Sequence, residues 1–206
     1  MAGYDVKKDH PELYAPKPGR MGTVQVPEFR FLQVDGHGDP NTTQAYADAV
    51  ATLYAVSYAV RAVAGRELDR VHTVAPLEGL WSAADPEVFA TRDKARWDWT
   101  MMIGQPEWIT DAIVEEGVAA AAKKGVAALD GLRFARYAEG LSVQVLHLGS
   151  YDDEGPVLAE MHDVYLPGNG YTWNGRHHEI YLSDPRRTAP EKLRTVLRQP
   201  VRPVTG

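Results

Sequence analysis

Residues 31–41, FLQVDGHGDPN, and residues 145–156, VLHLGSYDDEGP, are two similar stretches that decide the fold. Each begins with alternating apolar side chains, which are typical of a strand, and continues into a turn rich in Gly and Asp. Each also stands before a segment that is expected to be helical. The sequence therefore predicts the same strand-to-helix connection at two places in the chain.

The parallel continues beyond these stretches. Residues 80–86 (LWSAADP) match 180–185 (IYLSDP), and residues 102–106 (MIGQP) match 196–200 (VLRQP). A strand–helix–strand–strand module used twice predicts one α+β domain with antiparallel strands and a pseudo-two-fold axis. One such module cannot bury both faces alone, so we expect the copies to share a sheet or a cleft, where a ligand would bind. The expected parts are an arm (1–21), a first module (22–106), a connecting helix (107–129) and a second module (130–206).

The expected elements follow from periodicity and from turn residues. The arm should be anchored at Leu13 and Tyr14. A helix capped by Thr42 or Thr43 should end near Gly65. The other expected helices are 110–124 and 157–165, and the expected strands are 24–34 (broken at Pro27), 71–82, 95–105 (after a loop around 85–86), 132–148, 177–183 and 192–199.

Composition excludes several classes of protein. The 206 residues include 22 Lys+Arg and 28 Asp+Glu, for a net charge of -6, and no Cys. The lack of Cys excludes disulfides, thiolate metal sites and a cysteine nucleophile. No apolar run fits a signal peptide or a membrane helix, so we expect a cytoplasmic protein that does not bind membranes. The sequence has no dense basic face, so we expect no direct nucleic-acid binding. It also has no GxSxG motif, so we do not expect a serine hydrolase.

Aromatic residues are concentrated in one part of the chain. Four of the five Trp lie between residues 81 and 108, and strand alternation places Trp97, Trp99 and Met101 on one face. Such rings either fill a core or form a broad apolar surface for a ligand. Both alternatives remain open at this level.

The stretch 177–184, HHEIYLSD, carries the candidate chemistry. Alternation places His177, Glu179 and Tyr181 on one face, and Tyr181 matches Trp81 in the repeat. A carboxylate beside an aromatic ring suits a flat apolar or cationic ligand. The alternatives are that Glu179, like Glu78, is a solvent-exposed strand carboxylate, or that His177 and Glu179 are two metal ligands. No third ligand is evident, so we expect no metal and no cofactor.

Several motifs in order resemble a known family, the GyrI-like small-molecule-binding proteins. The motifs are FLQVDGHGDPNTTQAYADAVATLYAVSYAV, APLEGLWSA, WDWTMMIGQPEWIT and RHHEIYLSDPRRTAPEKLRTVLRQPV, between residues 27 and 201. The resemblance implies tandem strand–helix–strand–strand (SHS2) modules around a groove that binds bulky aromatic, often cationic compounds. Some members are effector domains of multidrug-responsive regulators with a helix-turn-helix domain. Only about twenty residues precede the first expected strand, so no transcription-factor role is expected here.

The matching branch of this family includes cyclopropanoid cyclopropyl hydrolases, which detoxify DNA-alkylating natural products of the yatakemycin and CC-1065 type. The resemblance implies that Glu179 is the acidic ligand-site residue, with Tyr181 beside it as a second catalytic residue. The implied aromatic cage comprises Trp81, Trp99, Met101, Tyr58, Tyr137 and Tyr171. A planar aromatic drug would be the partner. The alternatives are binding and sequestration without turnover, and a gyrase-binding role, and the sequence gives no oligomeric state.

Overall fold

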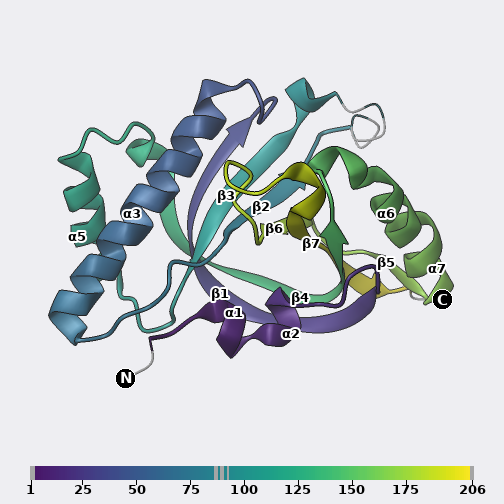
Figure 1. Ribbon diagram of the computed structural model, residues 1–206, viewed down its shortest axis with the longest axis horizontal. Helices are drawn as coiled ribbons and strands as arrows, with labels where there is room; N and C mark the ends of the chain where they lie inside the picture. Colours follow the sequence, from purple (N-terminus) through teal and green to yellow (C-terminus); the bar gives the residue numbers. More distant parts are fainter. Residues whose placement is uncertain (1–2, 86–87, 89–90, 92, 205–206) are drawn as a thin grey trace. The chain divides into compact units, whose positions relative to one another are not determined.

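The computed structural model describes residues 3–85, 88, 91 and 93–204, which form two compact units (Figure 1). The first unit consists of the residues up to Asp9 together with Phe29–Tyr137, and the second consists of His10–Glu28 together with the residues from Ala138 onward. Both units combine helices with antiparallel strands. The predicted α+β class is confirmed. Of the loop expected around 85–86, Pro86 lies outside the described residues.

The first unit is built on three antiparallel strands in the order β1-β3-β2. Asp35 of β1 is paired with Thr100 of β3, and Trp99 of β3 is paired with Trp81 of β2. The helices α3 and α5 lie side by side in this unit (Figure 1). Its elements are α1 (Val6–Asp9), β1 (Gly22–His37, from Phe29), α3 (Gln44–Leu68), β2 (Leu77–Ser82), η1 (Lys94–Arg96), β3 (Asp98–Gln105), α5 (Asp111–Ala122), η2 (Leu129–Gly131) and the start of β4 (Leu132–Leu148).

The second unit is centred on β7. Strands β4 and β6 both pair with the stretch of β7 around Thr195, and β5 pairs with its last residues, all antiparallel. The short helices pack on this sheet through an apolar core that includes Met161 and Leu197. Its elements are α2 (Pro11–Tyr14), β1 up to Glu28, β4 from Ala138, η3 (Tyr151–Asp153), α6 (Gly155–Ala159), the π-helix η4 (Glu160–Tyr165), α7 (Leu166–Gly168), β5 (Tyr171–Trp173), β6 (His177–Tyr181), η5 (Pro190–Lys192) and β7 (Arg194–Pro203).

Helix boundaries follow the local chemistry of the caps. The helix expected from residue 110 begins at Asp111, with Thr110 as its cap: the Thr110 hydroxyl accepts a hydrogen bond from the backbone N–H of Ile113 at 3.3 Å. The expected end of α3 at Gly65 is wrong. The helix continues to Leu68 and ends where Asp69 takes a left-handed conformation with φ of 50°.

Other expected boundaries also need correction. The strand break expected at Pro27 is wrong, because β1 runs through this residue. Pro27 is exposed, and a strand tolerates a proline, which has no N–H to donate, where the position faces water. The expected strand 71–82 begins only at Leu77, directly after Pro76. The expected strand 95–105 begins at Asp98, since η1 takes up the residues before it. The single helix expected over 157–165 is a run of α-, π- and α-helical turns from Gly155 to Gly168.

The N-terminal arm is anchored where the sequence predicted. Leu13 and Tyr14 are buried, with 0% and 4% of their surface exposed. The carbonyl oxygen of Leu13 accepts a hydrogen bond from Arg198, and that of Glu12 accepts one from Gln144, both at 2.7 Å. The helices α1 and α2 in this arm were not predicted, since four-residue helices are too short to show periodicity.

The first unit has the predicted order of a strand, a helix and two further strands, whereas the second has three strands after its helical turns, because β5, which was not predicted, precedes β6 and β7. Gly38 after β1 and Gly149 after β4 both have positive φ, 98° and 140°, a conformation that favours glycine. The strand-to-helix connection is therefore alike in the two halves of the chain. The groove shared between them stays a prediction. None of the helices in the described part of the chain has the length and apolarity needed to cross a membrane.

Candidate functional site

Strand β6 presents the predicted carboxylate and tyrosine on one face. His178 and Ile180 are buried, while His177, Glu179 and Tyr181 alternate with them and are partly exposed. The Tyr181 hydroxyl donates a hydrogen bond to Glu179 Oε2 at 2.7 Å. Only 15% of the Glu179 side chain is exposed, so it is not the solvent-exposed strand carboxylate of the alternative interpretation.

Four further side chains extend this pair into a row along the second unit. On one side, the ring of Tyr151 meets the ring of Tyr181 edge-on at 5.6 Å between centroids. On the other side, His177 Nε2 lies 3.5 Å from Glu179 Oε1. Beyond it the ring of His162 lies 6.1 Å from that of His177 and 4.3 Å from that of Trp173. We call these six residues the carboxylate row: Trp173, His162, His177, Glu179, Tyr181 and Tyr151.

The local electrostatics keep His162 uncharged near neutral pH. Burial, and next the charge of His177, lower the pKa of His162 to about 4. An uncharged imidazole can donate through one ring nitrogen and accept through the other. The row therefore combines a carboxylate, a phenol hydroxyl and a neutral imidazole, which are groups suited to moving a proton.

A buried charged network holds the opposite face of β6. His178 Nδ1 lies 3.0 Å from both carboxylate oxygens of Glu139, and Arg198 Nη1 donates to Glu139 Oε2 at 3.1 Å. Burial raises the pKa of Glu139, but the charges and hydrogen bonds of His178 and Arg198 outweigh burial and lower it below its usual range. This network fixes the backbone on the N-terminal side of Glu179, which positions the carboxylate.

The first unit gathers four aromatic rings. Tyr46 of α3 stacks on Trp81 at 6.4 Å between centroids and meets Trp99 edge-on at 5.2 Å. Trp97 meets Trp81 edge-on at 5.6 Å. We call Tyr46, Trp81, Trp97 and Trp99 the aromatic cluster. Tyr46 was not predicted at this place, since no pattern in the chain links it to the tryptophans.

Packing within the cluster is tight around Trp99. Its Nε1 donates a hydrogen bond to the Gly38 carbonyl at 3.2 Å, and only 2% of its surface is exposed. A Cβ at Gly36 would lie 2.0 Å from the Trp99 ring, so this strand position requires glycine. Trp99 thus has a core role in the first unit.

The remaining predicted cage residues lie in different surroundings. Met101 is fully buried, and a Cβ at Gly79 would lie 3.2 Å from its sulfur and 3.0 Å from Trp81 Nε1, so Met101 and Trp81 flank the same glycine. Tyr58 on α3 is 57% exposed. Tyr137 packs edge-on against Phe31 at 6.5 Å, and Tyr171 packs against the core of the second unit. Their ligand-binding roles stay predictions.

The described residues give the metal interpretation no supporting geometry. His178 lies on the buried face of β6, opposite the face that carries His177 and Glu179. Among the residues that the structure describes, no group of three or more His, Asp or Glu side chains is placed to hold a metal ion. Glu78, the other strand carboxylate considered, is 1% exposed rather than solvated.

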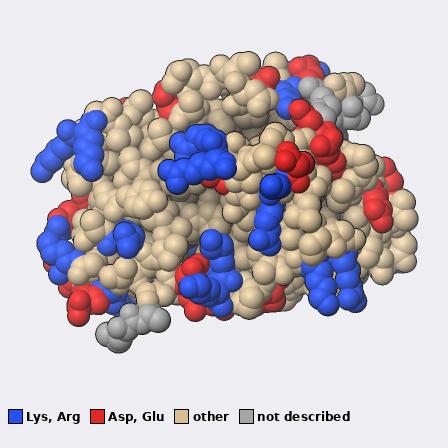
Figure 2. Space-filling view, viewed as in Figure 1, with Lys and Arg blue, Asp and Glu red and all other residues tan. Residues whose placement is uncertain are grey.

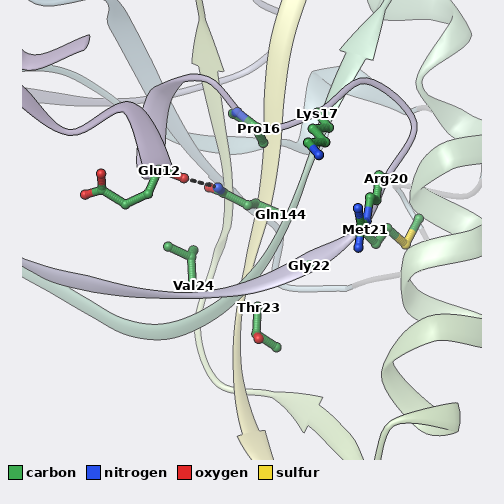
Figure 3. Close-up of a pocket in the computed structure, with 9 residues that line it drawn as sticks. All are labelled: Glu12, Pro16, Lys17, Arg20, Met21, Gly22, Thr23, Val24 and Gln144. Atoms are coloured by element: carbon green, nitrogen blue, oxygen red, sulfur yellow. Dashed lines mark hydrogen bonds between the residues drawn. The ribbon is translucent and has the colours of Figure 1, made fainter. Parts of the chain in front are cut away.

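A separate pocket of about 250 Å³ lies in the second unit, between the arm and the start of β1 (Figure 3). Gln144 contributes to its wall, and its amide is already bonded to the Glu12 carbonyl and to Arg198. Lys17 and Arg20 at its rim are exposed. On the face drawn in Figure 2, basic and acidic side chains are dispersed in small groups among uncharged ones. None of the predicted site residues lines this pocket.

Comparisons with other proteins place the chain in a family. The model of the GyrI-like small-molecule-binding domain matches residues 23–202. A conserved protein from Listeria innocua is 37% identical, with a TM-score of 0.88, over 97% of this chain and 100% of its own. Two structures of hydrolases from Listeria innocua are 35% identical, each matched over its whole length. They cover 97% and 98% of this chain, with TM-scores of 0.83 and 0.86.

A comparison with curated protein sequences gave no match. The family match spans most of the chain and includes both the aromatic cluster and the carboxylate row. The chain belongs to the GyrI-like small-molecule-binding family.

Proposed function

We propose that this protein is a hydrolase that opens the cyclopropane ring of cyclopropanoid DNA-alkylating natural products of the yatakemycin and CC-1065 type. The observation that carries the proposal is the hydrogen bond of 2.7 Å from the Tyr181 hydroxyl to Glu179 Oε2. It fixes a shielded carboxylate beside a phenol. The two Listeria innocua hydrolases, 35% identical over nearly the whole chain, support hydrolysis as the class of reaction.

The chemistry of these drugs suits such a pair. A strained cyclopropane is conjugated to a dienone, so water can form a C–O bond at the ring CH2 while a ring C–C bond breaks. The electron pair of that bond moves into the dienone, whose carbonyl oxygen becomes a phenolate and then a phenol. Glu179 takes a proton from the attacking water through Oε1, while Tyr181 holds Oε2 and so orients the carboxylate. The opened product no longer alkylates DNA, which provides detoxification or self-resistance.

The test is incubation of the protein with a cyclopropanoid drug, followed by mass spectrometry. The wild-type protein should convert the drug to a product that has gained one water. Glu179→Gln keeps the shape of the side chain but removes the base, so turnover should fall by about 100-fold or more. Glu191→Gln, at an exposed position in the same unit, is the matched control and should turn over normally. Recovery of unchanged drug from the wild-type reaction would contradict the proposal.

The second candidate is binding and sequestration of aromatic drugs without turnover. The aromatic cluster favours it, because Tyr46, Trp81 and Trp97 offer ring faces and edges within one unit. Sequestration predicts that unchanged drug co-elutes with the wild-type protein and that Trp81→Ala lowers affinity at least about tenfold. Trp108→Ala is the control, since that ring packs on His72 elsewhere in the same unit. Equal affinity of both variants would argue against this role for the cluster.

A further inference from the structure

We propose that His177 is a proton-relay residue of the Glu179 site. It receives from Glu179 the proton that the carboxylate takes from water. This inference rests on the proposed hydrolase function. It concerns the side of Glu179 that faces away from Tyr181.

The two oxygens of Glu179 have different neighbours. Oε2 accepts the hydrogen bond from Tyr181, whereas Oε1 lies 3.5 Å from His177 Nε2. Oε1 is therefore the oxygen that remains available to a proton from water. Catalytic contacts are commonly long before substrate binds and shorten in the reacting complex. A small movement of the His177 ring would bring Nε2 within hydrogen-bond distance of Oε1.

The His177 ring is shielded and yet makes no hydrogen bond. Its side chain is only 12% exposed. Within the described residues, neither of its ring nitrogens has a hydrogen-bond partner, although both are buried. Buried polar atoms without a partner are costly and uncommon, and they are found where a site is built to handle protons or ligands. The nitrogens of His177 can thus donate or accept hydrogen bonds that the folded chain does not make.

His177 faces two titratable side chains. Titratable groups contact it from two elements, Glu179 from β6 and His162 from η4. Because the pKa of His162 is lowered to about 4, that ring is neutral near pH 7. His162 is a positioning residue, held between His177 and Trp173 by a π-helical turn, a local structure frequent at functional sites.

Every proton that is removed in this reaction is returned, and no co-reactant other than water is needed. Water loses one proton to Glu179 Oε1 as its oxygen bonds to the cyclopropane carbon. Glu179 passes this proton to His177 Nε2 and returns to the carboxylate. The proton then passes from His177 to solvent, and the product phenolate takes one from solvent, so one water has been added across the broken C–C bond.

The test measures kcat and KM for a CC-1065-type drug with His177→Gln. Loss of the relay should lower kcat about 100-fold, with KM within about threefold of the wild-type value. With His177→Ala, imidazole added to the buffer should restore part of the lost kcat, which a merely structural role would not allow. His37→Gln, whose ring is 62% exposed, is the matched control and should keep the wild-type kcat.

The outcomes separate this inference from the proposed function. A wild-type protein that leaves the drug unchanged overturns the hydrolase proposal itself. If the wild-type protein turns over and Glu179→Gln does not, a His177→Gln variant with kcat within about threefold of wild type overturns the role of His177 alone. A low kcat in both His177 variants without rescue by imidazole, at unchanged thermal stability, also overturns it.

Discussion

Replacing Glu139 by glutamine should remove the negative charge that two buried cationic side chains share. The carboxylate of Glu139 bonds to His178 and to Arg198, and all three side chains are between 1% and 2% exposed. Glutamine has nearly the same shape, so no cavity forms. The guanidinium of Arg198 would remain buried without its counter-charge, which is the costly outcome.

The magnitude follows from which contacts survive. Breaking a buried ion pair by removing one partner costs about 3 to 5 kcal/mol. Arg198 would keep its hydrogen bonds to the Gln144 side chain at 3.0 Å and to the Leu13 carbonyl at 2.7 Å. We therefore expect the lower end, about 3 kcal/mol, which is a change of roughly 100-fold in the unfolding equilibrium constant.

Urea unfolding at pH 7 measures this loss as a lower midpoint with an unchanged slope. The matched control is Glu116→Gln, which breaks the pair between Glu116 and Arg66 in the first unit. Those side chains are 50% and 57% exposed, so the control should lose less than about 1 kcal/mol. If Glu139→Gln cost no more than Glu116→Gln, the assignment of a buried, charge-sharing network would be refuted.

Three further predictions concern stability. A Cβ at Gly117 of α5 would lie 2.7 Å from Val60, whereas one at Gly65 of α3 would meet nothing within 4 Å; thermal unfolding should show that Gly117→Ala destabilises the protein and that Gly65→Ala stabilises it by about 0.5 to 1 kcal/mol. Thr110→Ala removes the cap of α5 and should lower the free energy of unfolding by about 1 kcal/mol in urea, while an unchanged value would deny the cap any role. The pKa of His162 is lowered from 6.5 to about 4 by folding, so the unfolded chain binds more protons between these values. Its contribution to stability is complete above pH 6.5 and is lost as the pH falls toward 4, and His162→Gln should flatten that part of a plot of melting temperature against pH.

Local patterns in the sequence were sufficient for much of the fold. Alternation in HHEIYLSD placed Glu179 and Tyr181 together on the face opposite Ile180, and the structure confirms this. The anchor at Leu13 was also predicted, because Leu13 and Tyr14 stand out as an apolar pair in a polar, Pro-containing arm. Such features can be read from neighbouring residues alone.

The parts that were missed depend on contacts between distant residues. Tyr46 joins Trp81 and Trp99 only because α3 packs on the β1-β3-β2 sheet, and nothing near Tyr46 in the sequence indicates this. Similarly, His162 reaches His177 through a π-helical turn that no periodicity predicted. Helix α3 also continues through Gly65, where tertiary packing outweighs the modest intrinsic cost of a helical glycine.

The division of the chain into units has a consequence for its inheritance. Each unit is assembled from two separated stretches of sequence, with junctions after Asp9, Glu28 and Tyr137. A recombinant fragment that started at Ala138 would lack the Leu13 carbonyl, and it would leave a buried N–H of Arg198 without its partner. A single genetic crossover cannot transfer either unit whole, because exchange of one unit between two relatives requires a crossover at each of these three junctions.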